Sequence, residues 1–139
     1  MAFGPTPFDT PQQEGMLEPQ KAIAFLEEVL ALAYDDGLKA KVQIALGRQH
    51  EIAGNPTGAI RCYSDVIENT EPSGIVHYRR GQQYLSIGDL EKARQDLENA
   101  IRLGLDSQDQ TEAVVQLQKI NRSSTEQSSS LLSPLGSPP

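Results

Sequence analysis

The sequence has little of several residue types on which common protein functions depend. Among its 139 residues there is one cysteine, Cys62, there is no tryptophan, and aromatic residues make up 5%. A single cysteine excludes a disulfide within the chain and favours a reducing compartment. There is no Cys-x-x-Cys pair and no pair of histidines at metal-ligand spacing. We therefore expect no metal site and no cofactor.

Basic residues are also scarce, with 12 Lys and Arg against 19 Asp and Glu, a net charge of −7 and a pI near 4.7. Non-specific nucleic-acid binding needs a basic face, so we expect no nucleic-acid partner. No apolar run is long enough to cross a bilayer, and the first 15 residues lack the basic and apolar regions of a secretory signal. We expect a soluble, cytoplasmic protein without membrane insertion.

What the sequence does contain is an internal repeat. Residues 74–103 align with residues 40–69, and every matched pair is 34 residues apart. The matches are Gly47 with Gly81, Gly54 with Gly88, Ala59 with Ala93, Tyr63 with Leu97, Val66 with Ala100, and Ile67 with Ile101. A fixed period in this range is typical of stacked helical repeats.

Apolar residues at three- and four-residue steps predict two helices in each repeat, a preceding helix at residues 18–34 and a following one at 107–121. Gly54 and Gly88 are expected to adopt a left-handed conformation that ends the first helix of each repeat. The residues after these glycines, Asn55 and Asp89, are good N-caps for the second helix of each repeat. Ser73 is expected to cap the first helix of the second repeat. Such short turns make the helices of each pair antiparallel. The first helix of repeat one has as candidate buried positions Val42, Ala45, Leu46 and Ile52.

Both ends of the chain differ in composition from its middle. Residues 1–17 contain three prolines and residues 122–139 are rich in Ser and Pro, so both are predicted to be disordered. A second interpretation is that residues 131–134 and 137–138 are short recognition motifs or phosphorylation sites, and that phosphate there docks on Arg48 or Arg79. A solubilising tail is the simpler interpretation.

The two repeats resemble tetratricopeptide repeats, 34-residue helix–turn–helix units with the pattern W-x2-L-G-x2-Y … A-x3-F … P. The matching residues are Gln43, Leu46, Gly47, His50, Ala59 and Tyr63 in the first repeat and His77, Arg80, Gly81, Tyr84, Ala93 and Leu97 in the second. The opening aromatic is absent from both repeats, and Leu105 replaces the closing proline of the second. The resemblance implies an all-α fold, a short right-handed α-solenoid of antiparallel helix pairs with about six helices. It would span residues 18–121, with repeats at about 40–73 and 74–107.

Tetratricopeptide proteins typically bind peptides or protein surfaces in a concave groove lined by the first helix of each repeat. The resemblance therefore implies a non-enzymatic protein–protein interaction module, an adaptor or assembly factor. Residues at three- and four-residue steps place the following side chains in that groove: Lys41, Ile44, Arg48, Glu51 and Ile52 in the first repeat, and Ile75, Tyr78, Arg79, Gln82 and Leu85 in the second. Lys41, Arg48 and Arg79 are suited to a carboxylate, and Tyr78 to a rigid anchor.

Other functions are less well supported by the residues. The carboxylate clamp of chaperone-binding family members does not fit, because Asp109 has the wrong sign at one of its positions. His50 and His77 occupy packing positions and Cys62 lies beside a buried position, so we expect no catalytic site. The alternative is self-association through the exposed ends of the solenoid, since the helix at 18–34 carries apolar residues on more than one side: Ile23, Phe25, Leu26, Leu30 and Leu32.

Overall fold

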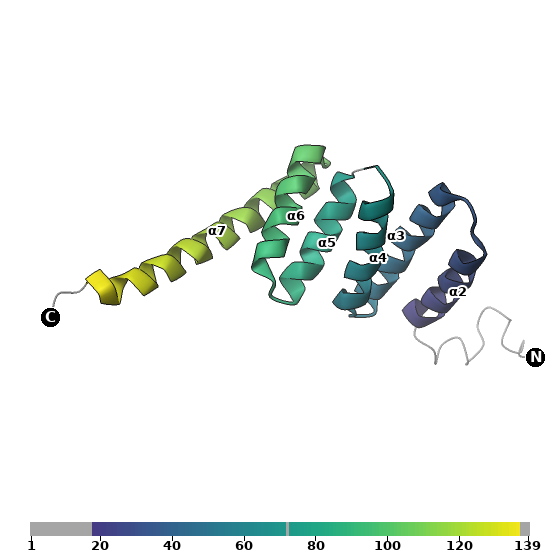
Figure 1. The fold of residues 1–139 in the computed structure, drawn as a ribbon, viewed down its shortest axis with the longest axis horizontal. Helices are drawn as coiled ribbons and strands as arrows, with labels where there is room; N and C mark the ends of the chain where they lie inside the picture. The colour runs from purple at the N-terminus through teal and green to yellow at the C-terminus, as the bar shows by residue number, and fades with distance from the viewer. Residues whose placement is uncertain (1–17, 72, 137–139) are drawn as a thin grey trace, which may run out of the picture. The chain divides into compact units, whose positions relative to one another are not determined.

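The computed structural model describes residues 18–71 and 73–136, which form six helices and no strand (Figure 1). Side chains are described as far as residue 124. The prediction of an all-α fold is confirmed, whereas the disordered arm predicted at residues 1–17 lies outside the described residues. The helices are α2 (Glu18–Leu32), α3 (Asp36–Ile52), α4 (Pro56–Asn69), α5 (Gly74–Ser86), α6 (Leu90–Leu103) and α7 (Ser107–Gly136).

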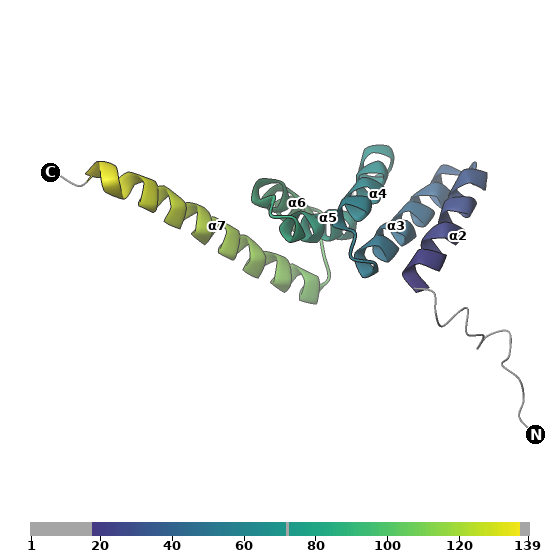
Figure 2. The same cartoon turned by 90° about the horizontal axis from the view of Figure 1, so that it is seen from below.

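The described residues form two compact units, 18–71 and 73–136. In the first unit α3 packs against both α2 and α4. In the second unit α6 packs against both α5 and α7. Two views show that the far end of α7 extends away from α5 and α6 (Figure 1, Figure 2).

Glycine ends the first helix of both hairpins, α3–α4 and α5–α6. Gly54 has φ 76° and Gly88 has φ 82°, a backbone conformation that residues with a Cβ rarely adopt. The side chains of Asn55 and Asp89 then accept a hydrogen bond from the backbone N–H three residues further on, at 3.1 and 3.2 Å. These turns and caps confirm the sequence prediction, and they make each hairpin short and antiparallel.

The contact between α3 and α4 depends on Gly47. The ring of the fully buried Tyr63 lies so close that a Cβ on Gly47 would be 2.4 Å from Tyr63 Cε1. The Tyr63 hydroxyl donates a hydrogen bond to the Glu51 carboxylate, back on α3. Tyr63 therefore fills the space that the missing side chain leaves, and it joins the two helices at both its ring and its hydroxyl.

The equivalent contact between α5 and α6 is looser. A Cβ on Gly81 would lie 3.2 Å from Asp96 Cβ and 3.4 Å from Leu97 Cγ. Leu97 is fully buried and belongs to a core that α6 shares with Ala113 of α7. The same glycine position thus permits a very close helix contact in one hairpin and a less crowded, still tight one in the other.

The border between α2 and α3 differs from the prediction. α2 ends at Leu32 instead of residue 34, and α3 begins at Asp36, before the repeat that the sequence places at about 40–73. The reason is that Asp35 is the N-cap of α3, where its Oδ2 accepts a hydrogen bond from Leu38 N at 2.8 Å. Residues of α2 cover the core of Val42, Leu46 and Cys62: Ile23, Leu26, Val29 and Leu30.

Two finer predictions are wrong. Ser73 occupies the N-cap of α5, but its side chain makes no capping hydrogen bond, so the backbone alone begins this helix. Ile52, a candidate buried residue, is 66% exposed because it is the last residue of α3 and stands at the hairpin turn.

The last helix is longer than predicted. α7 begins at Ser107, where the Asp106 side chain accepts a hydrogen bond from Asp109 N at 2.8 Å, as expected. It continues to Gly136, although the sequence predicts its end at about 121 and disorder from 122. Adding a residue to an existing helix costs little, and residues 107–133 contain neither proline nor glycine. Serine content alone was therefore a poor signal for the end of this helix.

We expect Gly47→Ala to destabilise the protein far more than Gly81→Ala. A new Cβ at residue 47 forces the buried Tyr63 ring to move, which costs about 2–3 kcal/mol. At residue 81 the milder crowding is offset by the better helix propensity of alanine, so stability stays within about 1 kcal/mol of wild type. Urea unfolding followed by circular dichroism measures both variants. Equal losses of stability in the two variants would mean that the Tyr63 ring does not restrict residue 47 more than Asp96 and Leu97 restrict residue 81.

Candidate functional site

The predicted groove residues form two sets, one on α3 in the first unit and one on α5 in the second unit. Those on α3 are, in order, exposed, half-buried, exposed, half-buried and exposed: Lys41, Ile44, Arg48, Glu51 and Ile52. Glu51 is used by the fold, since it accepts the hydrogen bond from Tyr63. The exposed residues of this set are therefore basic or apolar.

The set on α5 includes one exposed residue, Ile75, followed by four half-buried ones, Tyr78, Arg79, Gln82 and Leu85. Gln82 is joined to α7, because its Oε1 accepts a hydrogen bond from Gln116 Nε2 at 2.8 Å. Tyr78 and Leu85 pack against the core that α6 and α7 share. The structure thus brings part of the predicted set against α7. The α5–α7 face is the name used below for the surface of these residues: Tyr78, Gln82 and Leu85 of α5, Leu90 of α6, and Asp109, Glu112, Gln116, Lys119 and Ile120 of α7.

The contact between α5 and α7 keeps the offset of the sequence repeat. Gln82 and Gln116 are 34 residues apart. One turn further along α5, Leu85 lines a hollow together with Ile120, at almost the same separation. Both contacts keep the offset of the repeat, so the 34-residue period extends into α7.

Acidic side chains gather around Tyr78. Burial raises the pKa of the Tyr78 phenol, and the negative charges of Asp109 and Glu112 raise it further, while Arg79 acts in the opposite direction. The expectation that Arg79 reads a carboxylate stays a prediction.

Hydrogen bonds fix one of these acids on the face. Glu112 Oε1 accepts a hydrogen bond from Gln116 Nε2 at 3.1 Å, and the same nitrogen bonds to Gln82. From Ser107 to Gln118 the sequence of α7 contains no lysine or arginine. The first turns of α7 thus make one end of the face negative.

The other end of the face is apolar. A hollow of about 200 Å³ is lined by three apolar residues, Leu85, Leu90 and Ile120, together with Gln116, Lys119 and Ser123. Leu90 is exposed, and so is Ile87 in the adjacent turn. Filling such a hollow with an apolar side chain removes this surface from water and is favourable by about 25 cal/mol per Å².

A larger hollow, of about 510 Å³, lies in the first unit between α2, α3 and α4. Its charged lining is mixed, with Lys39 beside Asp36 and Asp65. Gln43 Nε2 donates to Asp65 Oδ2 at 3.3 Å across it. This arrangement favours neither sign of ligand.

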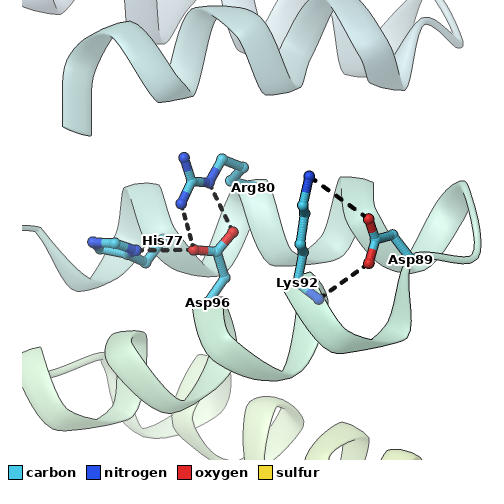
Figure 3. Close-up of polar contacts among 5 residues, drawn as sticks. All are labelled: His77, Arg80, Asp89, Lys92 and Asp96. Atoms are coloured by element: carbon cyan, nitrogen blue, oxygen red, sulfur yellow. Dashed lines mark hydrogen bonds and ion pairs between the residues drawn. The ribbon is translucent and has the colours of Figure 1, made fainter. Parts of the chain in front are cut away.

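The second hairpin contains a buried charge that sequence analysis missed. Asp96 of α6 is 2% exposed, and Figure 3 shows its carboxylate facing His77 and Arg80 of α5. Arg80 donates to it through Nε and Nη2, at 2.8 Å each, and His77 Nδ1 lies 3.1 Å from Oδ1. Burial by itself raises the pKa of the Asp96 carboxyl, but the hydrogen bonds from Arg80 and His77 outweigh it and hold the pKa below 3.8. The group links two helices and presents no binding surface.

A signal for this cluster was present in the repeat. At an offset of 34 residues, Arg80 takes the position of Leu46 and Asp96 that of Cys62. Leu46 and Cys62 lie together in the core of the first unit. An apolar pair in one hairpin is thus replaced by an ion pair in the other, and reading the two positions jointly would have predicted the contact.

The remaining candidate reactive groups have structural surroundings. His50 Nδ1 lies 3.3 Å from Asn55 Nδ2, and burial, followed by the charge of Arg61, lowers the pKa of its ring. Burial raises the pKa of the Cys62 thiol, which keeps it protonated at neutral pH. Where side chains are described, no cluster of three or more His, Cys, Asp or Glu residues is arranged to hold a metal ion.

Comparison with known proteins gave no relative: no family model matches the chain, and no curated protein matches it. Among the helices of residues 18–71 and 73–136, none is both long enough and apolar enough to cross a membrane. We therefore infer what the candidate surfaces bind from their own side chains.

We expect the Asp96 cluster to make stability depend on pH in acid. Since the pKa of Asp96 is lower in the folded state than its ordinary 3.8, its contribution is present above that pH and is lost as the pH falls through the folded-state pKa. The double variant Arg80→Leu/Asp96→Ala, which mimics the apolar pair of the first hairpin, should lose this acid-sensitive component. Its stability at neutral pH should stay within about 2 kcal/mol of wild type. Urea unfolding over a series of pH values measures both quantities.

The matched control is Arg80→Leu alone. It leaves the Asp96 carboxylate buried without its main partner and should cost about 3–5 kcal/mol at neutral pH. If the double variant is as unstable as Arg80→Leu alone, an apolar pair cannot replace the Arg80–Asp96 ion pair. The correspondence with Leu46 and Cys62 then does not explain these residues.

Proposed function

We propose that the chain is a non-enzymatic, cytoplasmic protein-binding module of the tetratricopeptide type, an adaptor or assembly factor. In this proposal the first helix of each hairpin, α3 and α5, contacts a segment of another protein. The observation that carries it is the presence of apolar side chains outside the core of these helices, above all Ile52, which is 66% exposed beside Arg48. Apolar surface rimmed by polar groups is typical of interaction sites.

The repeat supports the same proposal. The two hairpins share a 34-residue period, glycine-ended first helices and capped second helices. In such repeats each unit uses one side of its helices for stacking, which leaves another side for ligands. Neither hairpin uses Lys41, Arg48 or Ile75 for its own core.

Capture of partners by the immobilised chain tests this function. We expect Arg48→Glu/Ile52→Ser to reduce capture of a specific partner from a lysate of the source cells about tenfold, because charged and apolar contacts at an interface centre dominate affinity. The control, Arg61→Glu/Leu38→Ser, makes the same changes at exposed positions of α4 and at the start of α3. Quantitative mass spectrometry compares the captured proteins. Equal capture by wild type and both variants would exclude the α3 surface.

A second candidate function is self-association, and one observation favours it. All 15 residues of α2 are described and none is buried. Phe25 is 64% exposed and Leu32 is 81% exposed, and Tyr34 follows on the same exposed stretch. Pairing two copies through this helix would remove their apolar surface from water.

Sedimentation over a range of protein concentrations tests self-association. If α2 pairs two copies, the mass of the wild type should rise from 15.2 kDa towards twice that value. The variant Phe25→Ser/Leu32→Ser should stay monomeric, because the paired surface is lost. The control Ile87→Ser, exposed elsewhere in the chain, should behave like wild type. A wild-type mass independent of concentration would end this alternative.

A further inference from the structure

The α5–α7 face combines two features that the groove prediction did not join. Its negative end is made by Asp109 and Glu112 beside Tyr78, and Glu112 is held there through Gln116. Its apolar end is the hollow beside Leu85 and its neighbours on α6 and α7. Both ends lie within one compact unit.

The distance between the negative end and the hollow determines how far apart two side chains of a ligand must be. Tyr78 and Leu85 are separated by seven residues of helix, which is roughly 10 Å at about 1.5 Å per residue. An extended polyproline II segment rises about 3.1 Å per residue and brings every third side chain to the same side. A side chain and the third one after it would therefore span the distance from the acids to the hollow.

We propose that this face binds an extended segment of a partner protein with a basic side chain at one position and an aliphatic side chain three residues away. The basic group pairs with Asp109 and Glu112, and the aliphatic group fills the hollow beside Leu85. The inference deepens the proposed function and rests on it, since it names the partner chemistry of the α5 surface.

The chain's own ends do not have this chemistry. Residues 1–17 and residues 123–139 contain neither lysine nor arginine. An acidic segment is disfavoured as well, because like charges would meet beside Tyr78. The remaining occupant is a basic segment of another protein, and charge complementarity selects it.

The probe is a peptide with blocked ends, Gly-Ser-Gly-Arg-Pro-Pro-Leu-Gly-Ser-Gly, added to the full-length 15N-labelled chain at up to millimolar concentration. We expect NMR shift changes centred on the amides of α5 and of residues 107–123 of α7. A peptide with Glu in place of Arg, and one with Ala in place of Leu, should bind about tenfold more weakly, since each lacks one of the two contacts. Added salt should weaken binding of the Arg peptide, because the charge contact is exposed.

Two variants of the protein test whether Asp109 and Glu112 contact the basic side chain of the peptide. Asp109→Asn/Glu112→Gln removes two charges and keeps the side-chain shapes, and it should weaken binding of the Arg peptide about tenfold. Glu68→Gln/Glu71→Gln removes the same charge from exposed positions of the other unit and should leave binding unchanged. An equal loss in both variants would show a general charge effect and overturn the assignment.

The outcomes separate this inference from the proposed function. If the Glu peptide binds the same amides as tightly as the Arg peptide, the inferred charge is wrong while peptide binding by α5 stands. If no peptide shifts α5 or α7, or if the shifts lie elsewhere, the α5–α7 face is not the site and the inference is overturned. The proposed function is then decided by the capture experiment on α3, which uses different residues.

Discussion

Within each hairpin, the two helices approach each other closely where one of them has no side chain. In α3–α4 this point is Gly47, where the Tyr63 ring occupies the space that a Cβ would need. The buried ring and its hydrogen bond to Glu51 then fix how α4 lies on α3. The exposed positions of α3, among them Arg48 and Ile52, are fixed by the same contact because they lie on the same rigid helix.

The second hairpin meets the same constraint with different chemistry. Leu97 stands where the first hairpin has Tyr63 and is smaller, so Gly81 is less crowded. The space between the helices is used by the Arg80 and Asp96 side chains, whose hydrogen bonds replace an apolar pair. A buried ion pair adds little net stability but is costly to mismatch, so it ties α5 to α6 in one register.

Much of this fold could be predicted from local sequence, because its main determinants are local. Gly54 and Gly88 end helices through their own backbone freedom, and Asn55 and Asp89 cap the next helix within three residues. The start of α3 at Asp36 was missed because the Asp35 side chain caps this helix through one hydrogen bond, which the apolar period does not reveal. The extent of α7 was missed for a related reason, since serine is unfavourable in a helix by only a few tenths of a kcal/mol.

The candidate site was harder to predict, because its character depends on contacts between distant segments. Spacing along α5 selected Tyr78, Gln82 and Leu85, but it gave no information about the acids that α7 places beside them. The Asp96 cluster shows that such contacts can be found when equivalent positions of a repeat are compared in pairs. The same comparison relates Gln82 to Gln116, and it would have drawn attention to Glu112, which stands at the equivalent distance from Tyr78.

The candidate surfaces of the two units differ in charge. The exposed residues of the α3 set are basic or apolar, whereas the α5–α7 face is acidic at one end and apolar at the other. Charge complementarity therefore favours an acidic ligand at the α3 surface and a basic one at the acidic end of the α5–α7 face. The net charge of −7 does not reveal this, because it sums over faces of opposite sign.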